Sequence, residues 1–117
     1  MDVTRFADAK PYFPPKHNDC TALRLQGFEA SSADFAWVGL SHILPGGGAE
    51  MDAGPIGKIY VVLEGEVTVT LGDGTSATLA KRDSCFIPAN EAREVRNASN
   101  TVASMIVMMP YPPKDAT

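Results

Sequence analysis

The hydrophobic residues of this chain recur in short runs, and within most runs they alternate with polar residues. From residue 21 onward the runs are rich in Val, Ile, Leu, Phe and Thr and are bounded by Gly, Pro, Asn or Asp. This pattern is typical of β-strands joined by turns, because successive strand residues face opposite sides of a sheet. No segment has a convincing helical period. The predicted strands cover residues 22–28, 35–44, 58–63, 66–71, 76–79, 84–87, 93–97 and 102–109.

The connections between these runs are short. Gly72-Asp73-Gly74 separates two alternating runs and predicts a tight hairpin, because Asp-Gly accepts the positive φ angles of such turns. Glu64-Gly65 marks a second bend. Since there is no room for helical crossovers, we expect mainly antiparallel sheets that close into a barrel or a stacked pair. The predicted fold class is all-β.

The length of 117 residues corresponds to one domain. Residues 1–20 contain three prolines and no sustained period, which predicts an irregular N-terminal arm. The barrel is expected over residues 21–110, and residues 111–117 form a proline-containing C-terminal tail.

Composition and charge narrow the possible partners. Ten Lys and Arg stand against fourteen Asp and Glu, without a basic block, so nucleic acid is not an expected partner. No apolar run approaches the ~20 residues that span a bilayer, and the first residues lack the pattern of a secretory signal. Cys20 and Cys85 have neither zinc-site nor redox-motif spacing, which favours a reduced, cytoplasmic location.

Two segments carry a family resemblance. Pro45-Gly46-Gly47 precedes the run Lys58-Ile-Tyr-Val-Val-Leu-Glu-Gly65, and Pro88-Ala-Asn-Glu-Ala-Arg-Glu-Val-Arg-Asn97 follows further on. In both spacing and separation they resemble the two motifs of the cupin superfamily, over about residues 35–110. The resemblance is to small single-domain conserved-barrel cupins. It implies a double-stranded β-helix, or jelly-roll barrel, whose motif residues point inward at its open end.

The resemblance also implies positions for metal ligands, where family members use three histidines and a glutamate. Counted back from Gly65, these positions hold Asp52, Gly54 and Lys58, and the last histidine position holds Arg93. A longer spacing would place Met51 and Ala53 there. Protonated Lys and Arg have no lone pair to donate, and one carboxylate does not hold a transition metal. We therefore predict no metal ligands and no cofactor.

Strand alternation predicts which side chains share the interior. If Lys58 points into the barrel, Tyr60 does too, and Arg93 lies on the inner face of its own strand. Apolar residues and a few convergent polar groups are the usual composition of a small-molecule site. The predicted pocket comprises Asp52, Lys58, Tyr60, Arg93, Met105 and Val107, with Trp37 or His42 added from the preceding strand.

Two cations beside one carboxylate predict an anionic ligand. The planar guanidinium of Arg93 suits a carboxylate or enolate, since it can bond two oxygens at once. The alternative is that Asp52, Lys58 and Arg93 form an ion cluster that only holds strands together.

Three functions remain open. The first is a metal-independent lyase, isomerase or decarboxylase in which Arg93 binds a carboxylate, Lys58 stabilises an enolate oxygen and Asp52 moves a proton. The second is a non-catalytic ligand-binding or sensor domain. The third is a metal-dependent oxygenase with a rearranged site drawn from His42, His17, Asp52 and Glu50, although the chain has only two histidines. We also expect a homodimer, because outward apolar residues next to the sheet edges need cover.

Overall fold

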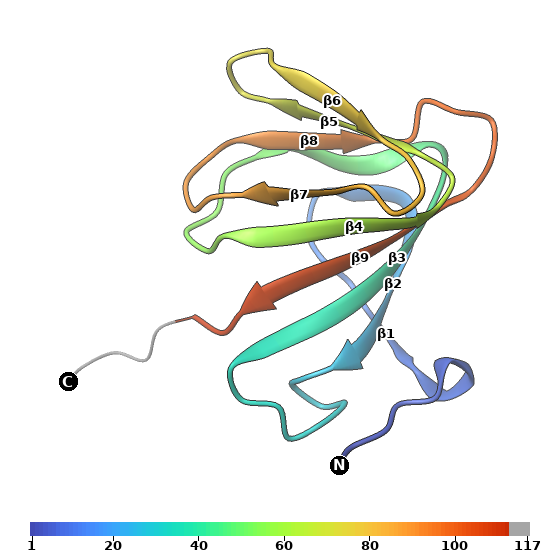
Figure 1. Ribbon diagram of the computed structural model, residues 1–117, viewed down its shortest axis with the longest axis vertical. Coiled ribbons are helices and arrows are strands. Elements are labelled where there is room, and N and C mark those ends of the chain that lie inside the picture. Colours follow the sequence, from blue (N-terminus) through green and yellow to red (C-terminus); the bar gives the residue numbers. More distant parts are fainter. Residues whose placement is uncertain (113–117) are drawn as a thin grey trace.

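The computed structural model describes residues 1–112 of the chain. Within them nine β-strands form one sheet in the order β6-β5-β8-β3-β9-β4-β7, with β2 also paired to β3 and β1 paired to β2. All strand pairs are antiparallel. The sheet curls on itself as a jelly-roll barrel (Figure 1). The strands are β1 (Lys10–Tyr12), β2 (His17–Gln26), β3 (Ala36–Asp52), β4 (Lys58–Glu64), β5 (Val67–Leu71), β6 (Ser76–Leu79), β7 (Ser84–Ile87), β8 (Arg93–Arg96) and β9 (Ala103–Pro110).

The all-β prediction is confirmed. The only helical element of the described residues is one 3₁₀ turn, Phe6–Asp8. No helix in this part of the chain is long and apolar enough to cross a bilayer. The predicted bounds of β6 and β7 match the structure, and those of β4, β5, β8 and β9 differ by at most one residue at either end.

The core occupies the closed part of the barrel, where strand alternation turns apolar side chains inward. Val62, Val67 and Val95 are fully buried or nearly so. They belong to one continuous cluster, and its other buried members are Ile43, Ala49, Tyr60, Val69, Leu79, Ile87, Ala103 and Met105. Tyr60 and Met105 also reach the cavity described below, so the core directly supports the candidate site.

Strand β3 is longer than predicted, because it continues through the glycine triplet instead of ending before it. Its first half pairs with β2 and β9, and its second half pairs with β8, while β2 stays paired to it at Gly48 and Ala49. At Gly48, with φ +151°, a Cβ would collide with the Val95 carbonyl. A glycine is therefore required where β3 meets β8, and this pairing carries Asp52 opposite Arg93.

A buried asparagine fixes the end of β8. Asn97 is 0% exposed. Its amide donates to the carbonyls of Ile43 at 2.9 Å and Thr101 at 2.8 Å, and its side-chain oxygen accepts from the backbone and hydroxyl of Ser99. Breaking these bonds would leave a buried amide unpaired, which is costly. Asn97 therefore holds β3 against the turn before β9.

The N-terminal segment corrects one prediction. Residues 1–20 are not a wholly irregular arm, because they contain β1 and the first residues of β2. Pro14 and Pro15, between these strands, line the barrel mouth. Most of the predicted tail, residues 113–117, lies outside the described residues. Tyr111 within it anchors the chain, since its hydroxyl accepts from the backbone of Phe28 and donates to the Ala33 carbonyl.

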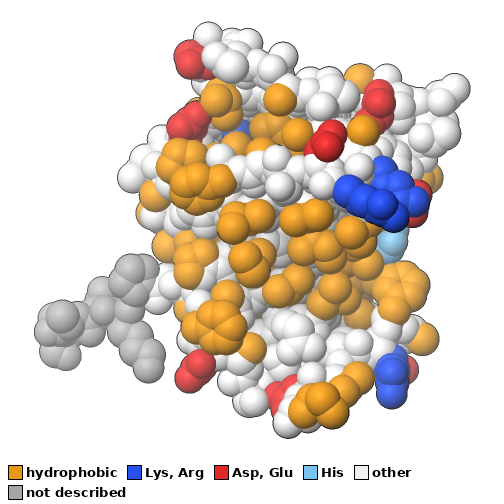
Figure 2. Space-filling model, viewed as in Figure 1, with side chains coloured by type: hydrophobic (Ala, Val, Ile, Leu, Met, Phe, Trp, Pro, Cys, Tyr) orange, Lys and Arg blue, Asp and Glu red, His pale blue; other side chains and the backbone are white. Residues whose placement is uncertain are grey.

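An apolar patch covers the outside of three neighbouring strands, and we call it the outer face. Its members are cross-strand neighbours facing away from the barrel interior: Ile59, Val61, Phe86, Ile106 and Met108. Phe86 is 64% exposed and Met108 38%. Figure 2 shows hydrophobic side chains gathered over β4 and β9.

Candidate functional site

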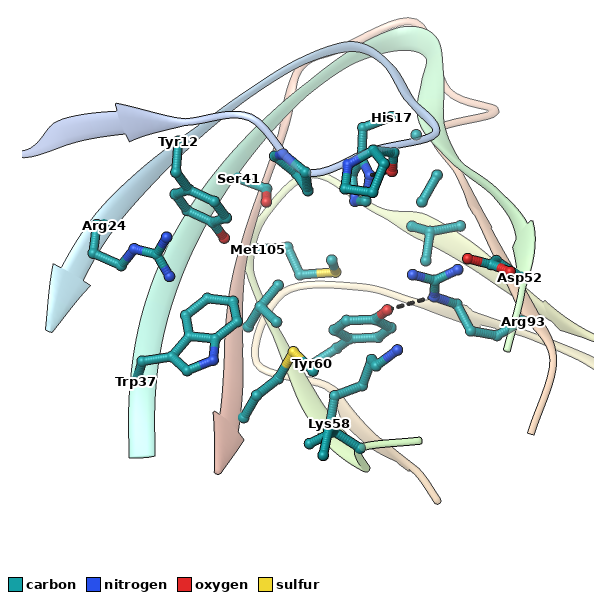
Figure 3. Close-up of a pocket in the computed structure, with 18 of the residues that line it drawn as sticks. Tyr12, His17, Arg24, Trp37, Ser41, Asp52, Lys58, Tyr60, Arg93 and Met105 are labelled. Atoms are coloured by element: carbon teal, nitrogen blue, oxygen red, sulfur yellow. Dashed lines mark hydrogen bonds between the residues drawn. The ribbon is translucent and has the colours of Figure 1, made fainter. Parts of the chain in front are cut away.

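The mouth of the barrel holds a cavity of about 450 Å³, within the range of small-molecule sites. Strands β2, β3, β4, β8 and β9 supply most of its walls. The sequence-predicted residues that line it are Trp37, Asp52, Lys58, Tyr60, Arg93, Met105 and Val107. The inward parity assigned to β4, β8 and β9 is therefore confirmed (Figure 3).

His42 does not line this cavity. It is five positions after Trp37 on a stretch of β3 with regular register, so alternation places the two side chains on opposite faces. The His42 ring packs edge-on to Phe6, with centroids 5.9 Å apart. The inclusion of His42 in the predicted pocket was thus wrong.

Arg93 is the most enclosed charge of the site, with 8% of the residue exposed. Its Nε donates to the Tyr60 hydroxyl at 2.7 Å, and one terminal nitrogen donates to the Glu50 carbonyl at 3.2 Å. No carboxylate of the described residues forms an ion pair with it. A buried cation without a counter-charge is costly, which marks this position as unusual.

Asp52 lies at the rim of the cavity and pairs with Lys16, not with Lys58 or Arg93. Its carboxylate accepts from Lys16 at 3.3 Å, and half of its side chain is exposed. The Lys16 ammonium, through this hydrogen bond, holds the pKa of Asp52 below its usual value. The alternative, an Asp52–Lys58–Arg93 ion cluster, is therefore not formed: within residues 1–112, Asp52 pairs with Lys16.

Burial shifts the pKa values of Tyr60 and Lys58, which lie near Arg93, in opposite directions. It raises the pKa of Tyr60, against the opposing charge of Arg93, so the phenol stays protonated at neutral pH. It lowers the pKa of Lys58, and the Arg93 charge lowers it further. Because the Tyr60 oxygen already accepts from Arg93, its own hydrogen is left to donate toward the cavity.

His17, considered above only as part of a rearranged metal site, lines the cavity. Its Nδ1 lies 2.7 Å from the Pro15 carbonyl, which can only accept, so Nδ1 carries the proton and Nε2 keeps a lone pair. Burial lowers the pKa of His17, with smaller effects in the same direction from Arg93 and Lys58. The imidazole is therefore a neutral base of fixed tautomer near two cations.

Sequence reasoning also missed Tyr12, Arg24, Phe28 and Ser41. Only Arg24 left a signal in the sequence, as a charge between Leu23 and Leu25 in an apolar strand. With it, two arginines, one lysine and a single carboxylate line the cavity among residues 1–112.

The metal implied by the family resemblance does not fit these residues. Lys58 and Arg93 occupy two of its ligand positions as cations. In the part of the chain that the structure describes, no three His, Cys, Asp or Glu side chains cluster closely enough to hold a metal ion. His17 in the cavity and His42 outside it are not brought together, so the rearranged metal site has no geometric basis.

Comparison with known proteins agrees with this architecture. A family model described as "Cupin domain" matches residues 39–109. The chain is 38% identical over 112 residues to a Mycobacterium tuberculosis protein named Beta-D-galactosidase Rv1717, covering 96% of both chains.

Solved structures agree on the fold. The polyketide cyclase RemF from Streptomyces resistomycificus superposes with a TM-score of 0.84 at 21% identity, over 97% of this chain and 82% of that one. An RmlC-like cupin from Shewanella frigidimarina gives 0.76 at 17% identity, over 98% and 95%.

Proposed function

This chain belongs to the cupin family, and we propose that its cavity binds a small organic anion, a carboxylate or enolate, without a metal. The observation that carries the proposal is Arg93, a buried guanidinium for which residues 1–112 provide no ion pair. Retaining such a charge costs stability unless a ligand neutralises it. An anion in the cavity would supply that counter-charge.

Three donors support recognition of the anion. Arg93 uses one terminal nitrogen for the Glu50 carbonyl, and no bond within residues 1–112 is recorded for the other. The Lys58 ammonium and the Tyr60 hydroxyl line the same cavity. Charge-assisted bonds from such donors are the strong ones, particularly from a planar guanidinium.

We assign the proton-transfer role to His17 in preference to Asp52. A useful base must be unprotonated at neutral pH and must gain from accepting a proton. The lowered pKa of Asp52 and its pairing with Lys16 make it a weak base at the rim. His17, neutral and with Nε2 free by tautomer, meets the requirement.

The reaction class that these groups favour is proton abstraction next to a carbonyl. His17 Nε2 takes the proton, and the C–H electron pair forms an enolate whose oxygen accepts from Tyr60 and Lys58. Reprotonation of the same carbon on its opposite face gives an isomerase, and expulsion of a leaving group with its bonding electron pair from the β-carbon gives a lyase. Without a productive substrate, the same cavity would act as a sensor.

A second candidate, hydrolysis of β-galactosides, is favoured by the identity to the mycobacterial protein that carries that name. Most glycosidases use a pair of carboxyl groups. Among the described residues lining the cavity, Asp52 is the sole carboxylate, so the second role would fall to Tyr60 or His17.

One pair of assays separates these functions. We expect the protein to exchange an α-proton of at least one 2-oxo acid for deuterium in D₂O, followed by proton NMR, and to release no nitrophenol from nitrophenyl β-D-galactoside. Nitrophenol release that is lost in Asp52→Asn would replace the first function with the second. Carboxylate binding without either reaction would leave the sensor function.

We further propose that a second copy of the chain covers the outer face. Exposed apolar patches of this kind mark interaction sites, and a two-fold axis lets one patch cover its own copy. Light scattering is expected to give twice the 12.4-kDa mass of one chain, and Phe86→Glu is expected to halve it. A wild-type mass of one chain at micromolar concentration would contradict this. The cytoplasmic location likewise remains a prediction.

A further inference from the structure

Arg24 lies in the same cavity, at the end opposite Arg93 (Figure 3). It projects inward from β2, opposite Gly39 of β3. A Cβ at Gly39 would collide with the Tyr12 hydroxyl, so the glycine makes room for the Tyr12 ring beside Arg24. The Arg24 cation is therefore built into the cavity wall by a specific local arrangement.

Three aromatic rings surround the Arg24 guanidinium. Its central carbon lies 4.0 Å from the ring centre of Tyr12, 4.5 Å from that of Phe28 and 4.7 Å from that of Trp37. Aromatic faces attract the cation and fix the plane of the guanidinium, but they do not satisfy its N–H donors. The donors at its edge stay available for a planar acceptor.

One of those donors, the Nε–H group, lacks a hydrogen-bond partner in the described structure. Arg24 Nε is buried without a hydrogen bond, and it is the only such side-chain atom among residues 1–112. The Glu29 carboxylate is 3.6 Å from Nε, and half of that side chain is exposed, while only 13% of Arg24 is. At 3.6 Å the pair is longer than a hydrogen bond, and water screens its half-exposed carboxylate, so the Arg24 guanidinium keeps an unsatisfied donor.

The space between the two arginines is apolar. Trp37, Met105 and Val107 line it, and Figure 3 shows Tyr60 and Met105 between Arg24 and Arg93. A molecule reaching both cations must present an acceptor at each end and a slim apolar middle.

We propose that Arg24 is a second anion-binding group, and that the ligand is an elongated diacid with an unsaturated or aromatic middle. One oxyanion lies on Arg93 and the other on Arg24, with the middle along Trp37. The inference rests on the proposed function for the Arg93 end and adds the substrate class.

A matched pair of probes tests it: trans,trans-hexa-2,4-dienedioate and trans,trans-hexa-2,4-dienoate, identical except for the second carboxylate. By calorimetry we expect the diacid to bind wild type about tenfold tighter or more. The chain has one tryptophan, Trp37, beside Arg24, so the diacid should also change its fluorescence more than the monoacid does. Equal affinities of diacid and monoacid, or no binding of the diacid, would overturn the inference.

Variants separate this inference from the proposed function. Arg24→Met, or Arg24→Lys if the first does not fold, should bring the ratio of diacid to monoacid affinity down to about one. Glu29→Gln is the control and should keep the advantage. An unchanged advantage in the folded Arg24 variant, or its loss in Glu29→Gln, would overturn the inference. Arg93→Met could leave monoacid affinity unchanged while Arg24→Met still removes the diacid advantage. That result would refute the proposed role of Arg93 and would leave Arg24 as an anion-binding group.

Discussion

Replacing Arg93 with methionine is expected to weaken the binding of small carboxylates by about a hundredfold or more, because truncating one partner of a buried charge pair removes most of its affinity. The ligand-free protein should change little in stability, by less than about 1 kcal/mol. Its lost hydrogen bonds to Tyr60 and Glu50 are offset by removal of an uncompensated buried charge. Titration calorimetry and thermal melting of both proteins measure the two effects.

Arg96 provides the matched control. It lies three residues along the same strand, so its side chain faces away from the interior, where it bonds the Glu94 carboxylate and the Gly46 carbonyl. Arg96→Met should therefore leave carboxylate affinity unchanged. Equal affinity in Arg93→Met and wild type would contradict the assignment, as would large destabilisation of Arg93→Met without any anion bound by wild type.

Replacing His17 with glutamine is expected to slow deuterium exchange about 10²- to 10⁴-fold, the usual contribution of a general base, with little change in ligand affinity. Wild-type exchange should fall as acid protonates His17, at a pH below the usual pKa of a histidine. This fall of the exchange rate in acid should be absent from the His17→Gln variant. The control is His42→Gln, which changes the other histidine, on the outside of the barrel. It should keep the wild-type exchange rate and the same fall of that rate in acid. An unchanged rate in His17→Gln would return the proton-transfer role to Asp52.

The same titration links His17 to stability. Its folded pKa is lower than its unfolded value of 6.5, so the unfolded chain binds the proton more readily. The contribution of neutral, buried His17 to the free energy of unfolding is fully present above pH 6.5 and is lost as the pH falls through the folded pKa. The free energy of unfolding of wild type relative to His17→Gln should therefore decline with acid.

Local sequence rules predicted the fold where the structure depends on local geometry. The hairpin at Gly72-Asp73-Gly74 formed as expected: Gly74 has φ +89°, and its backbone N–H donates to the Leu71 carbonyl at 3.0 Å. The strand over residues 35–44 was predicted to end before the glycine triplet. In β3 the triplet permits the close approach to Val95 instead, which depends on a strand distant in sequence.

The residues of the candidate site also fall into two groups, those that local sequence patterns predicted and those that depend on long-range contacts. Alternation along regular strands placed Lys58, Tyr60 and Arg93 correctly. His17 and Arg24 were missed because β2 begins in a proline-rich segment and has register shifts near both residues. The pairing of Asp52 with Lys16 spans 36 positions, so no local pattern could predict it. Long-range contacts of the N-terminal segment thus complete a cavity whose inner wall the strand pattern already predicts.

We propose that this cupin binds an organic anion through Arg93 without a metal. The most direct measurement is calorimetric titration of EDTA-treated wild-type protein, verified by elemental analysis, with a panel of aliphatic and aromatic carboxylates. We predict saturable binding near one equivalent per chain, unchanged when Fe, Mn, Ni or Zn is added back. Absence of binding by every carboxylate, or binding that appears only after metal is restored, would contradict the claim.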